Sequence, residues 1–143
     1  MELDYLVLAD AISARPDGKL DLHGVGWDTI VAGAVPVTHP RMDVAVRFLL
    51  APHELESQHT VVLMLVGQDG DELARIKAEI TPMPEAQRKA IPPGRRVGVG
   101  IMMSLAGVTF HAYGPHLLVV TWDGTEVREP LRLFVAPPPA PQG

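Results

Sequence analysis

The histidines of this chain are the residues most able to bind a metal or to transfer a proton. There are six, and none of them occurs in a His-x-His or His-Glu-x-x-His pattern. Zinc requires three or four converging ligands, and the chain has no cysteine to supply a thiolate. We therefore expect loop or surface histidines and no bound metal or cofactor. The six are His23, His39, His53, His59, His111 and His116.

Two of these histidines flank a glycine, and a turn there would bring their rings toward each other. This spacing leaves open an alternative function, a domain that binds a small ligand or a metal. Its site would lie in the loops around 51–59 and 111–116 and include His111, Tyr113 and His116.

The carboxylates give no motif for catalysis. Asp10 interrupts an otherwise apolar strand, where we favour a cap on local N–H groups over a general acid or base. Asp69 and Asp71 flank Gly70 like a fragment of a calcium loop, but the remaining ligands are missing, which predicts a simple turn. The glycine pairs at 24–26 and 98–100 open no helix that would bind a phosphate. We expect no catalytic residues and no enzyme activity.

Composition excludes further classes. The chain of 143 residues has a formal net charge of −5, which disfavours nucleic-acid binding because a nucleic-acid partner requires a basic surface. No apolar stretch approaches the roughly 20 residues of a membrane span. Glu2 and Asp4 stand where a signal peptide carries basic residues. We expect a soluble cytoplasmic protein, and abundant Ala, Pro, Val and Arg are typical of a GC-rich bacterial genome.

The elements that must position these residues are strands. Apolar residues recur with a period of two from end to end, and turn residues separate the runs. The segment 81–96 is rich in proline and predicts a long connection between strand pairs. The pattern predicts an all-β fold, a two-layer immunoglobulin-like sandwich of about eight strands. We expect one domain over 1–135 and a disordered Pro-rich tail over 136–143.

The closing segment predicts a β-hairpin. Asp123-Gly124 separates two strand-like runs, 116–122 and 125–135. A type I′ turn requires positive φ at both central residues, and Asp-Gly is among the pairs that adopt it most readily.

Three of the predicted strands are apolar on both faces, whereas a two-layer sandwich requires one apolar face per strand. Either the connection 81–96 covers the extra face, or a second copy or another protein does. We expect an assembly or interaction module, a possible homo-oligomer. Its interaction face consists of Val62, Met64, Val66, Leu117 and Val119.

Three stretches carry a likeness to a known family: Leu8-Ala9-Asp10-Ala11, the glycine-bearing run 16–27 that ends in Gly24-Val25-Gly26-Trp27, and the closing run 114–124. They resemble motifs of an uncharacterised bacterial family of small immunoglobulin-like proteins, a domain of unknown function. His116 stands where that family would have an aromatic residue such as tyrosine. The resemblance implies a fold and no activity.

Overall fold

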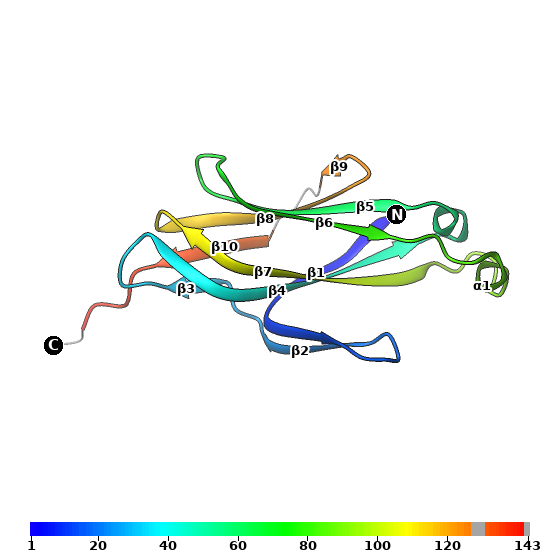
Figure 1. Cartoon of the computed structure of the whole chain (residues 1–143), viewed down its shortest axis with the longest axis horizontal. Coiled ribbons are helices and arrows are strands. Elements are labelled where there is room, and N and C mark those ends of the chain that lie inside the picture. Colours follow the sequence, from blue (N-terminus) through cyan, green and yellow to red (C-terminus); the bar gives the residue numbers. More distant parts are fainter. Residues whose placement is uncertain (127–130, 142–143) are drawn as a thin grey trace.

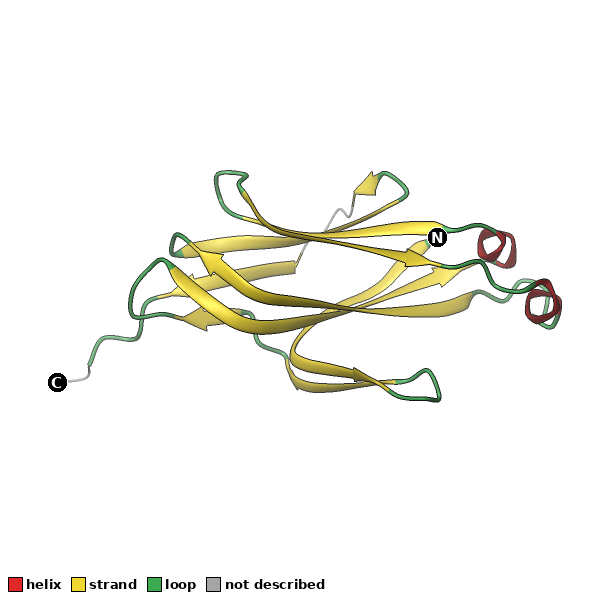
Figure 2. Ribbon diagram, viewed as in Figure 1, coloured by secondary structure: helices red, strands yellow, loops and turns green. Residues whose placement is uncertain are grey.

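The computed structural model describes residues 1–126 and 131–141. Two β-sheets pack face to face in this part of the chain (Figures 1 and 2). Two short helices lie together at one end, the 3₁₀-helix η1 (Pro52–Glu56) and α1 (Glu85–Lys89). The strands are β1 (Glu2–Ala14), β2 (Leu20–Val25), β3 (Thr29–Val31), β4 (Val37–Leu50), β5 (His59–Val66), β6 (Glu72–Ile80), β7 (Val97–Phe110), β8 (Gly114–Trp122), β9 (Thr125–Glu126) and β10 (Leu131–Ala136).

The order of strands is β2-β1-β4-β7 in one sheet and β3-β10-β8-β5-β6 in the other, where β9 also pairs with β8. Neighbouring strands are antiparallel, except that β3 runs parallel to β10. The predicted all-β sandwich is confirmed, and its described sheets have four and six strands. No described helix has the length and apolar character needed to span a bilayer.

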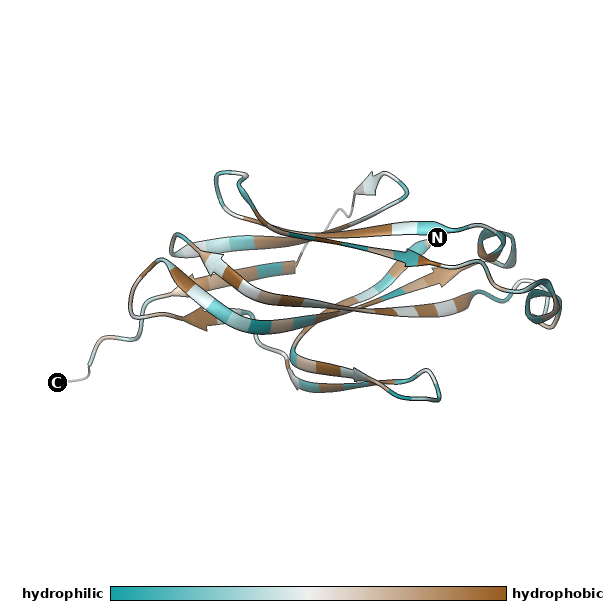
Figure 3. Ribbon diagram, in the orientation of Figure 1, coloured by the Kyte–Doolittle hydropathy of each residue, from teal (hydrophilic) through white to brown (hydrophobic). Residues whose placement is uncertain are grey.

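The period-two pattern places the core between the sheets. Alternate residues of β4 from Met42 to Leu50 are fully buried, and so are Val61, Leu63 and Leu65 of β5. Successive side chains of a strand point to opposite faces, so this alternation directs one row of each strand inward. Figure 3 shows the apolar run of β5 as a brown ribbon between hydrophilic turns.

The Pro-rich connection 81–96 closes one end of the sandwich. The N–H of Met83 donates a 2.9 Å hydrogen bond to the carbonyl of Leu55, and α1 contacts η1. Met83 and Ile91 pack against the main core. The sequence left open whether this connection covers the extra apolar face. These contacts instead hold the connection at the end of the sandwich (Figure 1).

Strand β1 changes its partner along its length. It pairs with β4 as far as Ala9, and from there to Ala14 it pairs with β2 alone. The hairpin formed with β2 folds onto the outer face of its own sheet, where a second small cluster includes Ile12 and Ala45. Leu20 of β2 lies against Gly100 of β7, 3.8 Å from the position that a Cβ would take. One outer face is therefore covered by the chain itself.

The closing hairpin has the predicted turn. Asp123 and Gly124 both have positive φ, +47° and +80°, and Trp122 pairs with Thr125 on either side of them. Strand β10 also pairs with β8, but its register is shifted by two residues relative to that of β9. Residues 127–130 of the predicted second strand, and 142–143 of the predicted tail, lie outside the described residues.

Replacing Gly124 with alanine is expected to destabilise the protein by about 1–2 kcal/mol, because a Cβ is strained at this left-handed φ. No other atom lies within 4 Å of the position of that Cβ, so backbone strain is the whole effect. Urea denaturation measures it. Gly33 is the matched control, since its Cβ also meets open space and its φ is ordinary. An equal loss in Gly33→Ala would contradict the explanation.

Candidate functional site

The predicted interaction face lies on the outer side of the β8–β5–β6 sheet. Met64 pairs with Val119 and Val66 with Leu117, so the side chains of these cross-strand pairs share one face. Val119 is 8% exposed and the other residues of this face are half-buried. None of them belongs to either hydrophobic cluster of the described part of the chain. We call Val62, Met64, Val66, Leu117 and Val119 the outer strip.

Charged side chains flank the outer strip. On the β6 side, Lys77 pairs with Val62 and Arg75 pairs with Met64. The Nη2 of Arg75 lies 3.1 Å from the Sδ of Met64, so the guanidinium rests beside the thioether. Each cation has an acidic partner on its own strand: Arg75 pairs with Glu72, and Lys77 Nζ lies 3.8 Å from a carboxylate oxygen of Glu79.

Asp43 is a fully buried carboxylate on the outer face of β4, beneath the β1–β2 hairpin. Its Oδ2 accepts hydrogen bonds from the backbone N–H of Ile12 at 2.8 Å and from Arg41 Nη2 at 2.6 Å. Its Oδ1 accepts from Ser104 Oγ at 2.6 Å and from Arg41 Nε at 3.1 Å. Burial raises the pKa of Asp43, but the bonds from Arg41, Ser104 and Ile12 outweigh burial and hold it below the ordinary value.

This carboxylate, not Asp10, is the buried acid of the sheet. Asp10 is exposed, and its carboxylate lies against the backbone of Gly24, 2.0 Å from where a Cβ would be. Asp43 lies between Met42 and Val44 on β4, on the opposite face from their core-facing side chains. Only the hairpin that folds over that face buries it, and no local pattern signals that fold.

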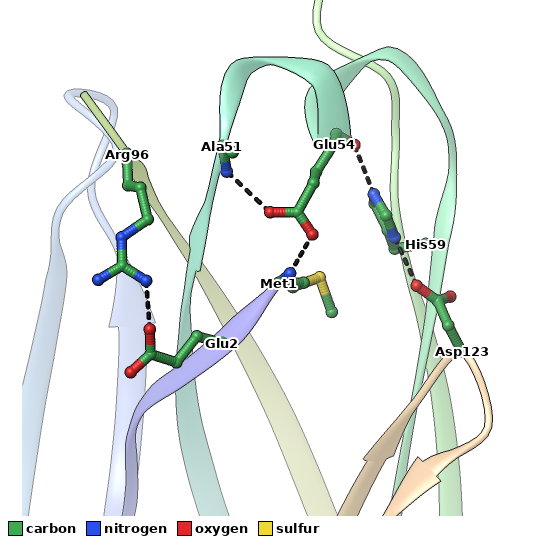
Figure 4. A network of polar contacts seen from close by, with 7 residues as sticks. All are labelled: Met1, Glu2, Ala51, Glu54, His59, Arg96 and Asp123. Carbon is green, nitrogen blue, oxygen red and sulfur yellow. Dashed lines mark hydrogen bonds and ion pairs between the residues drawn. The ribbon is translucent and has the colours of Figure 1, made fainter. Parts of the chain in front are cut away.

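His59 is the second buried polar centre, at the end of the sandwich beside η1 (Figure 4). Its Nε2 donates to the carbonyl of Glu54 at 2.5 Å, and its Nδ1 lies 2.5 Å from Oδ2 of Asp123 in the hairpin turn. The side chain of Glu54 accepts from the N–H of Ala51 and pairs with the amino group of Met1. These contacts join the chain start, η1 and the hairpin turn.

The charges of this network support one another. Burial lowers the pKa of His59, but the hydrogen bonds to Asp123 and to the Glu54 carbonyl raise it above the ordinary value. The bond from His59 lowers the pKa of Asp123, and the Met1 amino group lowers that of Glu54. The prediction of surface histidines is wrong for two of the six, since His59 is 8% and His116 is 3% exposed.

The predicted ligand site is divided in the structure. The loop 51–59 lies beside η1 at one end of the sandwich, whereas the β7–β8 turn lies at the other (Figure 1). Tyr113 donates a 2.9 Å hydrogen bond to the carbonyl of Ala32, which gives its hydroxyl a structural role. His111 and His116 line one pocket together with Asp69 and Asp71 of the β5–β6 turn. In the described part of the chain, no three His, Asp or Glu residues could hold one metal ion.

Comparison with known proteins identifies a family for this chain. No curated protein matches this chain. A family model described as a family of unknown function, DUF6941, matches residues 4–135. That match covers both sheets from β1 to the greater part of β10. The chain belongs to the DUF6941 family of unknown function.

Proposed function

We propose that this protein is a non-enzymatic interaction module that pairs with a second copy of itself through the outer strip. One observation carries the proposal: the strip is a continuous apolar row on the outside of a sheet whose inner row already fills the core. Leu63, Leu65 and Leu118 are fully buried on the inner side. An apolar row on the outer side is stabilised when another apolar surface covers it.

The charges around the strip favour a second copy as the partner. Arg75 and Lys77 each pair with an acid of their own strand, so the β6 rim presents balanced charge. Two copies related by a twofold axis would bring identical surfaces together, which balanced rims permit without strong repulsion.

The two buried polar centres support a role without catalysis. Four hydrogen bonds surround the carboxylate of Asp43, and both ring nitrogens of His59 have partners. Groups satisfied in this way stabilise the fold and have no free lone pair or proton to offer a substrate. The net charge of −5 and the absence of cysteine support a cytoplasmic role without a nucleic-acid partner.

Light scattering after size-exclusion chromatography tests the pairing. We expect a mass twice that of the 15.5 kDa chain, and Met64→Lys or Val119→Glu should weaken association about tenfold or more because each would bury an unpaired charge. Val25→Lys is the matched control, since Val25 is 52% exposed on β2, away from the strip. A wild-type monomer at all concentrations, or variants that pair normally, would refute the proposal.

A further inference from the structure

Strand β7 forms one edge of its sheet, and its backbone on that side has no partner strand among the described residues. It pairs with β4 along its length and with no other described strand. The backbone groups of a strand alternate between its two sides, so about half of the N–H and C=O groups of β7 point away from β4. A free edge of this kind can accept one more strand.

The edge strand β7 lacks the charges that disfavour such pairing. No Asp, Glu, Lys or Arg occurs between Val97 and Phe110. The edge strand of the other sheet, β6, contacts β7 along the same side of the sandwich, and it has Arg75, Lys77 and Glu79 at alternate positions. Charged side chains protect an edge strand from further pairing. Of these two edges, β7 is therefore the one that favours an added strand.

A groove runs beside the first part of β7. Its larger part is a cavity of about 520 Å³, which lies between residues 99–102 of β7 and residues 79–84 at the end of β6. A second cavity of about 270 Å³ continues the groove to Val97, and Met83 lines both cavities. Residues 97–102 extend over about 20 Å at the usual rise of a strand. The groove therefore has room for an extended segment of about six residues.

The wall opposite β7 is held in place by the protein itself. Met83 and Ile91 pack against the main core. The N–H of Arg95 donates a 3.2 Å hydrogen bond to the carbonyl of Pro92, which closes a turn just before β7. A groove with fixed walls loses little conformational freedom when a ligand binds.

The charges of the groove differ between its two parts. Arg95 lines the smaller cavity, is exposed and forms no ion pair with any described side chain, whereas the adjacent Arg96 pairs with Glu2. Glu79 lines the larger cavity. A segment that complements this groove therefore has an acidic residue at the Arg95 end and apolar side chains along the middle.

We propose that this groove binds an extended segment of a partner protein, which adds to β7 as one more strand of the β2-β1-β4-β7 sheet. The backbone of the segment forms hydrogen bonds with the free edge, and its apolar side chains pack against Met83 and Ile101. An antiparallel segment meets Arg95 with an acidic residue near its own C-terminal end. This surface lies outside the outer strip, so it adds a second kind of partner to the proposed pairing.

Isothermal titration calorimetry of the intact chain with the synthetic peptide Lys-Val-Thr-Val-Thr-Val-Glu, acetylated and amidated at its ends, tests this site. We expect saturable binding, and amide hydrogen exchange over 97–102 should slow in the complex. Arg95→Glu should raise Kd about fivefold, because it replaces an attraction with a repulsion. Lys19→Glu is the matched control, since Lys19 is an exposed cation between β1 and β2 and its replacement should leave Kd unchanged.

A second peptide separates strand addition from contact with charges alone. Three prolines in place of its central Thr-Val-Thr keep both charges but prevent a strand, so this peptide should not bind. Equal binding of the two peptides would overturn the proposal, as would no binding of the first peptide or a Kd that Arg95→Glu leaves unchanged.

The variant Met64→Lys separates this groove from the outer strip. It should bind the first peptide as the wild type does, and loss of binding would assign the peptide to the outer strip and overturn the proposal. If the peptide instead dissociates dimers of the Met64→Lys chain, a second copy occupies the β7 edge and the proposal is wrong.

Discussion

Replacing Asp43 with alanine is expected to destabilise the protein by about 3–5 kcal/mol, the largest loss we predict for a single polar side chain. The substitution leaves the N–H of Ile12 and the hydroxyl of Ser104 without their acceptor beneath the β1–β2 hairpin. Buried polar groups without partners cost more than the hydrogen bonds themselves contribute. Urea denaturation followed by tryptophan fluorescence measures the change.

Two further measurements separate the carboxylate from its neighbours. Ser104→Ala removes one of the four hydrogen bonds and should cost about 1 kcal/mol. The pKa of Asp43 is lowered in the folded protein, so its contribution is present above the unfolded value of 3.8 and is lost as the pH falls through the lower folded value. The free energy of unfolding of Asp43→Ala should therefore fall less steeply in acid than that of the wild type. Equal slopes for the two proteins would contradict the role given to this carboxylate.

Replacing His59 with leucine is expected to cost about 2–3 kcal/mol, because the hydrogen bonds to Asp123 and to the Glu54 carbonyl disappear together. Leucine keeps most of the volume, so a cavity contributes little. The loss should be largest at acidic to neutral pH. The pKa of His59 is raised on folding, so its contribution is complete below the unfolded value of 6.5 and is lost as the pH rises through the folded value.

Thermal denaturation from pH 5 to pH 9 checks this pH dependence. The wild type should lose stability toward high pH more steeply than His59→Leu does. His23→Gln is the control, since His23 is exposed on β2 and its replacement should leave the slope unchanged. Parallel curves for the wild type and His59→Leu would show that the imidazole carries no extra proton in the fold.

The sheets could be predicted from the sequence because their signals are local. Alternation of apolar residues identifies a strand whatever its partner, and Asp123-Gly124 specifies its turn through backbone φ alone. Leu118 and Val120 alternate with Leu117 and Val119 along β8, and the structure buries Leu118 and Val120 in the core. The predicted loop around 51–59 contains the 3₁₀-helix η1.

The polar centres could not be predicted, because each depends on a distant pairing. His59 meets Asp123 only because β5 pairs with β8 along its length. Asp43 is buried only because β1 exchanges β4 for β2 after Ala9. Residue type alone therefore pointed to Asp10 as the carboxylate within an apolar strand, because Asp10 interrupts an apolar run. In the structure, Asp10 is exposed.

The hairpin that lies over one outer face also has a consequence for the proposed pairing. A molecule with two bare apolar faces can stack without end, as subunits do in a filament, since every addition exposes a fresh surface. Here the β1–β2 hairpin occupies one face, so the proposed pairing through the outer strip would leave no second apolar face open. Under that proposal, growth would stop at two copies because the folded-over hairpin would block further addition.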